Sequence, residues 1–304
     1  LHPLTVNRSK AMLPILGKPI VERVMEDLAA NGIHDFILVV SPDDHLIRRY
    51  FEQESGLAAT VHFVNQPERK GMADALRYAA PLIEHDFILS ACDNLVSAGH
   101  VGQMVDRFRT TPCPNGVLSL MRVEPERQGS LGMVEMQGDW IMRIVEKPSP
   151  GQASSDVSSL PLYLFSAKIL DFLTQVPPSP RGEYELQDAI QMLIEHDGKV
   201  CGVTTPGRLT LTSPADLLAI NRHFLVEVGG DVRLPSHAVG PGTQLVPPLY
   251  IESGAWIGAD CTIGPQVYIE RDCRIGDGVR IQNAVLLRGG NVPDEARIEN
   301  QVIS

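Results

Sequence analysis

Chemically useful side chains follow short apolar runs in the first third of the chain. Gln66 follows TVHFV (60–64), and its amide can present both a donor and an acceptor to a ligand. Gly71 permits close backbone approach before a helical pattern, whose N-terminus favours phosphates. Asp93 follows FILSAC (87–92), where one carboxylate can bind Mg²⁺ together with substrate phosphates, although an aspartate there can also cap a helix.

A sheet that would position these residues is predicted from alternating strand and helix patterns. Helical spacing predicts a helix over about 20–31, a second that ends near Glu54 and a third after Gly71. Strand-sized apolar runs lie between them, at 36–40, 60–64 and 87–92. This alternation predicts an α/β fold with a Rossmann-like, mostly parallel sheet, whose ligands bind at the carboxyl ends of the strands.

The middle of the chain has a different pattern. Strand patterns broken by Gly, Pro and Ser clusters fill 116–166 and predict an extension of the sheet with a second binding wall. Helical periodicity returns at 167–175, 184–196 and 214–228. The Pro- and Gly-rich stretch 229–248 is predicted to be a linker. We therefore expect two domains, 1–230 and 231–304.

Isoleucine at every sixth position forms the clearest repeat. It comprises Ile251, Ile257, Ile263, Ile269, Ile275 and Ile281. The same period places in register Ala255, Cys261, Val267, Cys273, Val279 and Val285. Hexapeptide repeats predict a short left-handed parallel β-helix with identical side chains stacked inside. Cys261 and Cys273 are then small buried residues, and the flat faces favour assembly into a homo-oligomer.

Composition limits the partners and the location. The net charge of -11 argues against nucleic-acid and anionic-membrane partners, because those surfaces need clustered Lys and Arg. Five cysteines without a C-x-x-C pair predict neither a disulfide framework nor a zinc site, and indicate a cytoplasmic protein. The apolar runs fall short of the roughly 20 residues of a membrane helix, and no signal-peptide pattern opens the chain.

Seven segments stand in a characteristic order. They are LHPLTVNRSKAMLPILGKPIVERVMEDL (1–28), QPERKGMADAL (66–76), FILSACDNLVS (87–97), LGMVEM (131–136), IVEKP (144–148), SSLPLYLFS (158–166) and RGEYELQDAI (181–190). Together they resemble sugar-1-phosphate nucleotidylyltransferases, and in particular the glucose-1-phosphate thymidylyltransferases. The resemblance covers about 1–228, and the ordered combination is specific although each segment alone is weak.

The resemblance implies roles for the nucleotide half of a site. Lys10 matches the lysine that binds the triphosphate, where a fixed ammonium stabilises the departing pyrophosphate. Gln66 and Gly71 lie in the segment that resembles the base-binding turn, and Asp93 matches the magnesium-binding aspartate. The implied cofactor is therefore Mg²⁺, and the implied ligands are a nucleoside triphosphate and a sugar 1-phosphate.

The resemblance also implies a sugar half. Gly132 would approach the sugar by its backbone, Glu146 would accept hydrogen bonds from its hydroxyls, and Lys147 would hold the 1-phosphate. Adjacent residues on a strand point to opposite faces, so presenting both Glu146 and Lys147 to one ligand requires a bulge or a strand end at Pro148. Glu183 is either a sugar contact or a solvated residue at a helix start.

The chain departs from the family pattern at three places. It begins at Leu1, immediately after the point where a Gly-rich loop should end, so we expect the natural protein to start earlier. Loss of the strand before that loop would leave buried backbone groups unpaired, at about 1–3 kcal/mol each. Cys92 replaces the usual glycine before Asp93. Thr210 stands where a second aspartate usually contacts the metal, and a hydroxyl is a poorer magnesium ligand.

The predicted reaction is nucleotidyl transfer from a nucleoside triphosphate, dTTP or UTP, to glucose 1-phosphate. Guanylyl transfer to mannose 1-phosphate remains open, as does a non-catalytic regulatory subunit that still binds nucleotide sugars. A further alternative is a bifunctional enzyme whose β-helix transfers acyl groups. Such enzymes generally need a histidine base, and the last histidine, His237, precedes the repeats.

Overall fold

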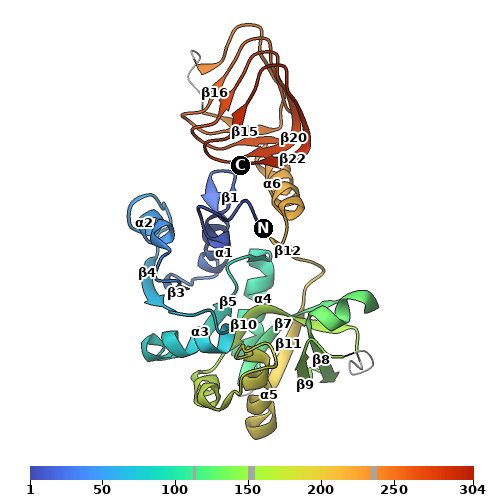
Figure 1. The fold of residues 1–304 in the computed structure, drawn as a ribbon. Coiled ribbons are helices and arrows are strands. Elements are labelled where there is room, and N and C mark those ends of the chain that lie inside the picture. The colour runs from blue at the N-terminus through green and yellow to red at the C-terminus, as the bar shows by residue number, and fades with distance from the viewer. Residues whose placement is uncertain (112–113, 150–154, 234–237) are drawn as a thin grey trace. The chain divides into compact units, whose positions relative to one another are not determined.

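The computed structural model describes residues 1–111, 114–149, 155–233 and 238–304, drawn in Figure 1. The chain forms two compact units. Unit 1 comprises Leu1–Arg23 and Leu209–Ser304, and unit 2 comprises Val24–Arg208. These units are groups of dense contacts, and the domain boundary near residue 230 stays a prediction. His237 and Cys113 lie outside the described residues.

Unit 2 contains two sheets. A parallel pair is formed by β3 (Asp35–Val40) and β4 (Thr60–Asn65). The larger sheet has the strand order β5 (Phe87–Ser90), β10 (Val157–Phe165), β7 (Gly116–Arg122), β11 (Val200–Thr204), β9 (Trp140–Glu146) and β8 (Gly132–Gln137). The predicted α/β fold is confirmed.

The larger sheet is mixed, whereas the sequence predicted a mostly parallel one. β7 and β11 pair in parallel, while β10 runs antiparallel to β5 and β7, and β9 runs antiparallel to β8 and β11. The physical reason is the short connections after residue 116. Gly138, with a φ of 60°, turns the chain directly from β8 into β9, and such a tight turn can join only antiparallel strands.

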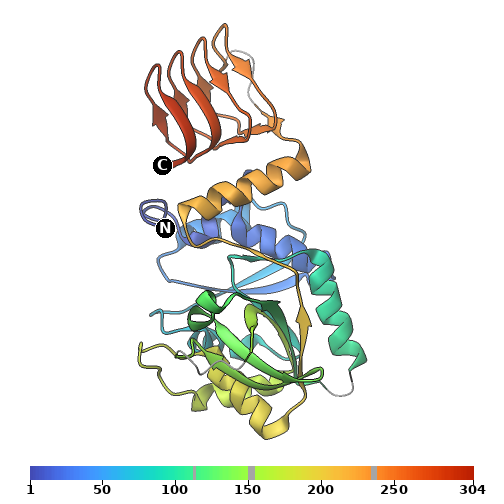
Figure 2. The same cartoon turned by 90° about the vertical axis from the view of Figure 1, so that its right-hand side faces the viewer.

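Helices cover the strands of unit 2 (Figures 1 and 2). They are α1 (Ile20–Ala29, which begins in unit 1), α2 (His45–Gln53), α3 (Met72–Ala79), α4 (Ala98–Thr110) and α5 (Leu186–Asp197), with 3₁₀ helices η2 (Ala80–Leu82), η3 (Pro125–Ser130) and η4 (Ala167–Gln175). The helices predicted near 20–31 and before Glu54 are confirmed, and the pattern at 167–175 forms a 3₁₀ helix. The core beneath them includes Leu118, Tyr163, Phe165, Leu186 and Ile190, each with at most 1% of its surface exposed.

The first part of unit 1 is a small hairpin. The 3₁₀ helix η1 (Lys10–Met12) leads into β1 (Pro14–Ile15), which pairs antiparallel with β2 (Lys18–Pro19). Gly17 has a φ of 81° at the turn between them. This region places Lys10 just before a buried strand.

The second part of unit 1 begins with β12 (Leu209–Thr210) and α6 (Pro214–Val228), which matches the predicted helix at 214–228. Ser213 and Asp216 form a capping box at its start, and Gly229 ends it in the left-handed conformation with a φ of 71°. These local signals explain why the helix could be predicted to the residue.

The repeats form the predicted parallel β-helix, whose stacked coils are visible in Figure 2. Its strands are β13 (Asp231–Val232), β14 (Gln244–Leu245), β15 (Leu249–Ile251), β16 (Trp256–Ile257), β17 (Thr262–Ile263), β18 (Val267–Ile269), β19 (Arg274–Ile275), β20 (Arg280–Leu286), β21 (Asn291–Val292) and β22 (Arg297–Ile303). The six repeated isoleucines are at most 1% exposed and stack inside. Cys261 and Cys273 are buried among them, as predicted.

Two details of the β-helix correct the sequence analysis. Val267 pairs with Ala284, so the predicted register of Val285 was wrong. The six-residue period shortens at the corner before Ala284, where Asn283 has a φ of 44°. Secondly, β13 and β14 already pair with strands of the β-helix although they lie in the predicted linker. In the described part of that stretch, Gly240 and Gly242 lie against Ala259 and Asp260 of the next coil, so a composition typical of a linker belongs here to the β-helix.

Candidate functional site

The turn after β4 in unit 2 holds the predicted base-binding residues. Gln66 is half-buried, and its Nε2 donates to Oδ2 of Asp74 at 2.8 Å and to the carbonyl of Gly71 at 3.4 Å. Asp74 is itself buried and lies 3.8 Å from the Arg77 guanidinium. The structure therefore brings Gln66 and Gly71 together and fixes the orientation of the Gln66 amide through its nitrogen.

Gly71 caps α3 with a φ of 98°, a backbone conformation that residues with a Cβ atom rarely adopt. A Cβ atom placed on Gly71 would lie 2.5 Å from the carbonyl oxygen of Tyr184 and 2.8 Å from its nitrogen. Tyr184 also donates from its amide to Lys70 at 2.7 Å and accepts from the Ala73 amide at 3.1 Å. The turn is thus held against the segment before α5 by main-chain contacts that only glycine permits.

Asp93 lies in the turn between β5 and β6 (Asn94–Leu95), at the predicted carboxyl end of an apolar strand. It interacts electrostatically with Arg208, whose Nη1 donates to Oδ1 of Asn94 at 3.0 Å. Asn94 is buried, and its Nδ2 lies without a hydrogen-bond partner. The turn therefore combines one carboxylate, one guanidinium and one buried amide donor that a ligand could engage.

Arg208 was missed by the sequence analysis. Burial lowers its pKa; Asp93 and Tyr163 act in the opposite direction, and Arg127 adds to the lowering. Burial raises the pKa of Tyr163 to about 12, with Glu146 acting in the same direction and Ser159 and Arg208 opposing. Asp93 therefore acts electrostatically on Arg208, and Glu146 acts on Tyr163. The only sequence signal for Arg208 was a basic residue two positions before Thr210. The residues around it come from strands that are far apart in the sequence.

Gly132 and Glu146 face each other across the β8–β9 pair. β9 ends at Glu146, and Lys147 has a φ of 44°, so the backbone has the strand end that the sequence analysis required. The Lys147 amide donates to Leu131 at 3.0 Å, and its Nζ lies 3.5 Å from Oε1 of Glu146. The two side chains are therefore presented together, as a carboxylate beside an ammonium.

Small and polar groups surround this pair. A Cβ atom on Gly132 would lie 3.0 Å from Ser159 Oγ, 3.1 Å from Glu146 Oε2 and 3.4 Å from Gln187 Cγ. Ser159 is buried, and its hydroxyl also acts on the Tyr163 hydroxyl. A buried hydroxyl beside a glycine can serve a polyhydroxyl ligand, because such a ligand offers both donors and acceptors.

Glu183 lies at the edge of the same region, three residues before α5. Its side chain is 47% exposed and lies 3.7 Å from Nη2 of Arg181. The same Arg181 atom donates to Oε1 of the buried Glu185 at 2.5 Å and lies 4.0 Å from Oε1 of Glu146. Arg181 and Glu185, both missed from the sequence, therefore stand between Glu183 and the Glu146–Lys147 pair.

Lys10 and Thr210 belong to unit 1. Lys10 starts η1 and is half-buried, and Thr210 ends β12. In the described part of the chain, no three His, Cys, Asp or Glu side chains gather as a metal-binding group. A metal ion at Asp93 would therefore take its remaining ligands from substrate oxygens and water, which Mg²⁺ accepts.

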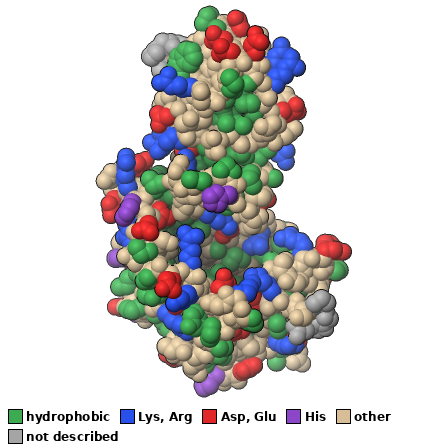
Figure 3. Space-filling model, viewed as in Figure 1, with side chains coloured by type: hydrophobic (Ala, Val, Ile, Leu, Met, Phe, Trp, Pro, Cys, Tyr) green, Lys and Arg blue, Asp and Glu red, His purple; other side chains and the backbone are tan. Residues whose placement is uncertain are grey.

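A hollow of about 430 Å³ is lined by Gln103, Asp106, Arg107, Thr110, Asp139, Gly202 and Val203. Among the described residues, this lining includes none that the sequence analysis selected. On the face drawn in Figure 3, basic and acidic side chains are interspersed. Every helix in the described ranges falls short of the length and apolar character that a membrane span requires.

Solved structures share this fold. A UDP-glucose pyrophosphorylase in complex with UDP-glucose matches with a TM-score of 0.68 and 18% identity, over 75% of this chain and 94% of that one. A putative glucose-1-phosphate thymidylyltransferase from Bacillus anthracis matches with a TM-score of 0.63 and 19% identity, over 73% and 88% of the two chains.

Sequence comparisons find relatives and matching family models. Glucose-1-phosphate thymidylyltransferase from Streptomyces griseus is 27% identical over all of this chain and 88% of its own length. The bifunctional protein GlmU of Methanococcus maripaludis is 26% identical over all of this chain and 74% of its own length. The GMPPB C-terminal domain family matches residues 245–304, and the nucleotidyl transferase family matches residues 1–215. Because residues 1–215 are most of its length, the chain belongs to the nucleotidyl transferase family.

Proposed function

We propose that this enzyme transfers a nucleotidyl group from a nucleoside triphosphate to a sugar 1-phosphate. The observation that carries the proposal is the Glu146–Lys147 pair beside Gly132, where a carboxylate can accept from sugar hydroxyls and an ammonium can bind the 1-phosphate. The relatives described as glucose-1-phosphate thymidylyltransferase and UDP-glucose pyrophosphorylase support glucose 1-phosphate as the acceptor.

The proposed reaction needs no protein nucleophile. An oxygen of the sugar 1-phosphate attacks the α-phosphorus of the triphosphate, a new P–O bond forms, and the α–β phosphoanhydride bond breaks to release pyrophosphate. Lys147 orients the attacking phosphate, and Lys10 stabilises the charge that develops on pyrophosphate. Asp93 would hold Mg²⁺, which when bound neutralises charge on the phosphates.

Gln66 limits the choice of base. Because its Nε2 donates to Asp74 and Gly71, the amide oxygen remains as the acceptor that a base edge can meet. Uracil, thymine and guanine carry a ring N–H at that edge, whereas the corresponding ring nitrogens of cytosine and adenine are acceptors. We therefore propose UTP or dTTP as the donor, with GTP and mannose 1-phosphate as the second candidate pair.

Pyrophosphate release by the full-length protein with Mg²⁺ tests the proposal. UTP, dTTP, GTP and ATP are each combined with the 1-phosphates of glucose, mannose and N-acetylglucosamine. Release with UTP or dTTP and glucose 1-phosphate supports the proposal. If no pair reacts while a nucleotide sugar still binds, the proposed transfer is wrong and a regulatory subunit is the better description.

Lys147→Asn is expected to raise the KM for the sugar 1-phosphate by about 10- to 100-fold, because it removes a charge-assisted contact of about 1.5–3 kcal/mol. Asparagine tolerates the positive φ of Lys147, so the backbone should be kept. Lys168→Asn, which removes an exposed lysine 3.0 Å from Asp197, is the matched control. Equal KM values for the two variants would exclude Lys147 from the phosphate site.

Glu146→Gln is expected to weaken binding of the sugar 1-phosphate without lowering the stability of the protein at pH 7. Burial is the largest influence on Glu146 and raises its pKa, Glu185 acts in the same direction, and Lys147 and Arg181 oppose it. Because the folded protein then holds this proton more tightly than the unfolded chain, stability falls as the pH rises from 4.5 through the raised pKa. At pH 7 the variant should therefore melt no earlier than wild type.

The same variant should raise the KM for the sugar 1-phosphate about tenfold, because an amide accepts sugar hydroxyls less strongly than a carboxylate. Melting curves between pH 4 and 8 and initial rates measure the two effects. Glu135→Gln, which alters an exposed pair with Arg143 on neighbouring strands, is the control. A lower melting temperature at pH 7 with an unchanged KM would contradict both expectations.

A further inference from the structure

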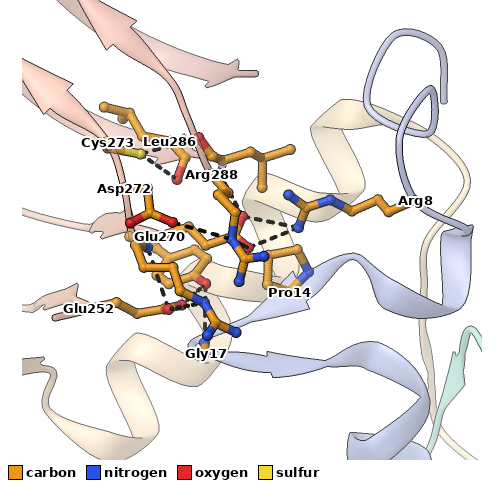
Figure 4. A network of polar contacts seen from close by, with 12 residues as sticks. Arg8, Pro14, Gly17, Glu252, Glu270, Asp272, Cys273, Leu286 and Arg288 are labelled. Carbon is orange, nitrogen blue, oxygen red and sulfur yellow. Dashed lines mark hydrogen bonds and ion pairs between the residues drawn. The ribbon is translucent and has the colours of Figure 1, made fainter. Parts of the chain in front are cut away.

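Within unit 1, the segment that carries Lys10 is held at both of its ends. Its start is Arg8, two residues before Lys10, and its end is the β1–β2 turn at Leu16 and Gly17. Both ends contact side chains from the second part of unit 1. Figure 4 shows the contacts of Arg8 and Gly17 with the β-helix.

At the start of the segment, Nη1 of Arg8 donates to both carboxylate oxygens of Glu270, at 2.9 and 3.0 Å. The Glu270 side chain is 6% exposed. It also accepts from the Arg288 amide at 2.7 Å and lies 3.8 Å from the Arg288 guanidinium. Arg288 of the adjacent coil thus holds Glu270 in addition to Arg8.

At the end of the segment, the Leu16 amide donates to Oδ1 of Asn221 at 3.1 Å, and Nδ2 of Asn221 donates to the Pro14 carbonyl at 3.2 Å. The Gly17 amide donates to the buried Tyr268 hydroxyl at 3.3 Å. Tyr268 in turn donates to Oε1 of Glu252 at 2.5 Å. These contacts fix the hairpin at the end of the segment, and the Arg8–Glu270 pair fixes its start.

We propose that Glu270 is a positioning residue: by holding Arg8 it sets the place of η1 and of the Lys10 ammonium. The inference deepens the proposed function and rests on it, because Lys10 is there assigned to the triphosphate. It gives the β-helix a part in the reaction, since a residue on one of its coils holds the segment that bears Lys10. Glu270 itself touches no reacting atom.

A buried carboxylate suits this purpose for a physical reason. Water is largely excluded from Glu270, so loss of its charge removes the carboxylate that compensates Arg8, whereas the Arg288 guanidinium keeps Asp272 at 3.9 Å. The segment can then relieve that penalty by moving Arg8 towards solvent. A displacement of the order of 1 Å at a charged group can reduce a rate by about 100-fold.

The test uses full-length Glu270→Gln, Arg8→Ala and the double variant, compared with Asp277→Asn. Asp277 accepts from the Ala259 amide at 2.7 Å inside the β-helix, so this control matches the loss of a carboxylate in a coil. Glu270→Gln should lower kcat by about 10- to 100-fold while the KM for the sugar 1-phosphate stays unchanged. The double variant should be no slower than the slower single variant, because both changes break the same contact.

Hydrogen exchange gives a readout that does not need activity. The amides of Met12 and Leu13 donate to Ser9 and Lys10 at 3.0 and 3.1 Å, and they should exchange faster in Glu270→Gln than in Asp277→Asn. If wild type releases no pyrophosphate, the proposed function fails, and the exchange rates still test the anchor. Equal exchange in the two variants, or single effects on kcat that multiply in the double variant, would overturn the inference.

Discussion

Asp93→Asn is expected to lower kcat for pyrophosphate release by about 10²–10³-fold, the usual cost of losing one group that stabilises developing charge. Asparagine keeps the shape of the side chain but removes the charge that would hold Mg²⁺. It also removes the carboxylate that counteracts the effect of burial on the pKa of Arg208, so the turn after β5 becomes more positive. Initial rates over a range of Mg²⁺ concentrations measure the effect.

The control is Asp86→Asn, which changes an exposed aspartate directly before the other end of β5. It should react at the wild-type rate with the wild-type magnesium dependence. A shift to higher magnesium concentration in Asp93→Asn would support a metal ligand. Unchanged rates at every magnesium concentration would rule out the proposed role of Asp93.

Gly71→Ala is expected to destabilise the protein by about 3 kcal/mol or more, and to abolish saturation by the nucleotide in any protein that folds. The added Cβ would lie 2.5 Å from the Tyr184 carbonyl, against main chain that cannot rotate away. Relief requires separating the Gln66 turn from the segment before α5. Thermal melting and nucleotide titration measure the two losses.

Gly32→Ala is the matched control for this change. Gly32 has a φ of 84°, yet nothing lies within 4 Å of a Cβ placed on it. The variant should therefore show the cost of the left-handed backbone alone, about 1–2 kcal/mol. If Gly71→Ala is no less stable than Gly32→Ala, the close approach of Tyr184 does not constrain the turn.

The sequence alone determined the elements whose signals are local. Ser213, Asp216 and Gly229 mark the ends of α6, and the six repeated isoleucines identify the β-helix, because each signal acts within a turn or a coil. The ordered motifs also indicated the family, which the match over residues 1–215 supports. A bulge or a strand end at Pro148 could be required from the sequence because adjacent strand residues point to opposite faces, and β9 ends at Glu146.

Only the tertiary structure decided which distant residues meet. Arg8 and Glu270 are separated by 262 positions, and Arg208 and Asn94 by 114, so no local pattern predicts either contact. The antiparallel place of β10 between β5 and β7 likewise depends on packing of the whole sheet. Local propensity sets where strands and helices begin and end, whereas burial and charge compensation between remote segments determine the environment of each site residue.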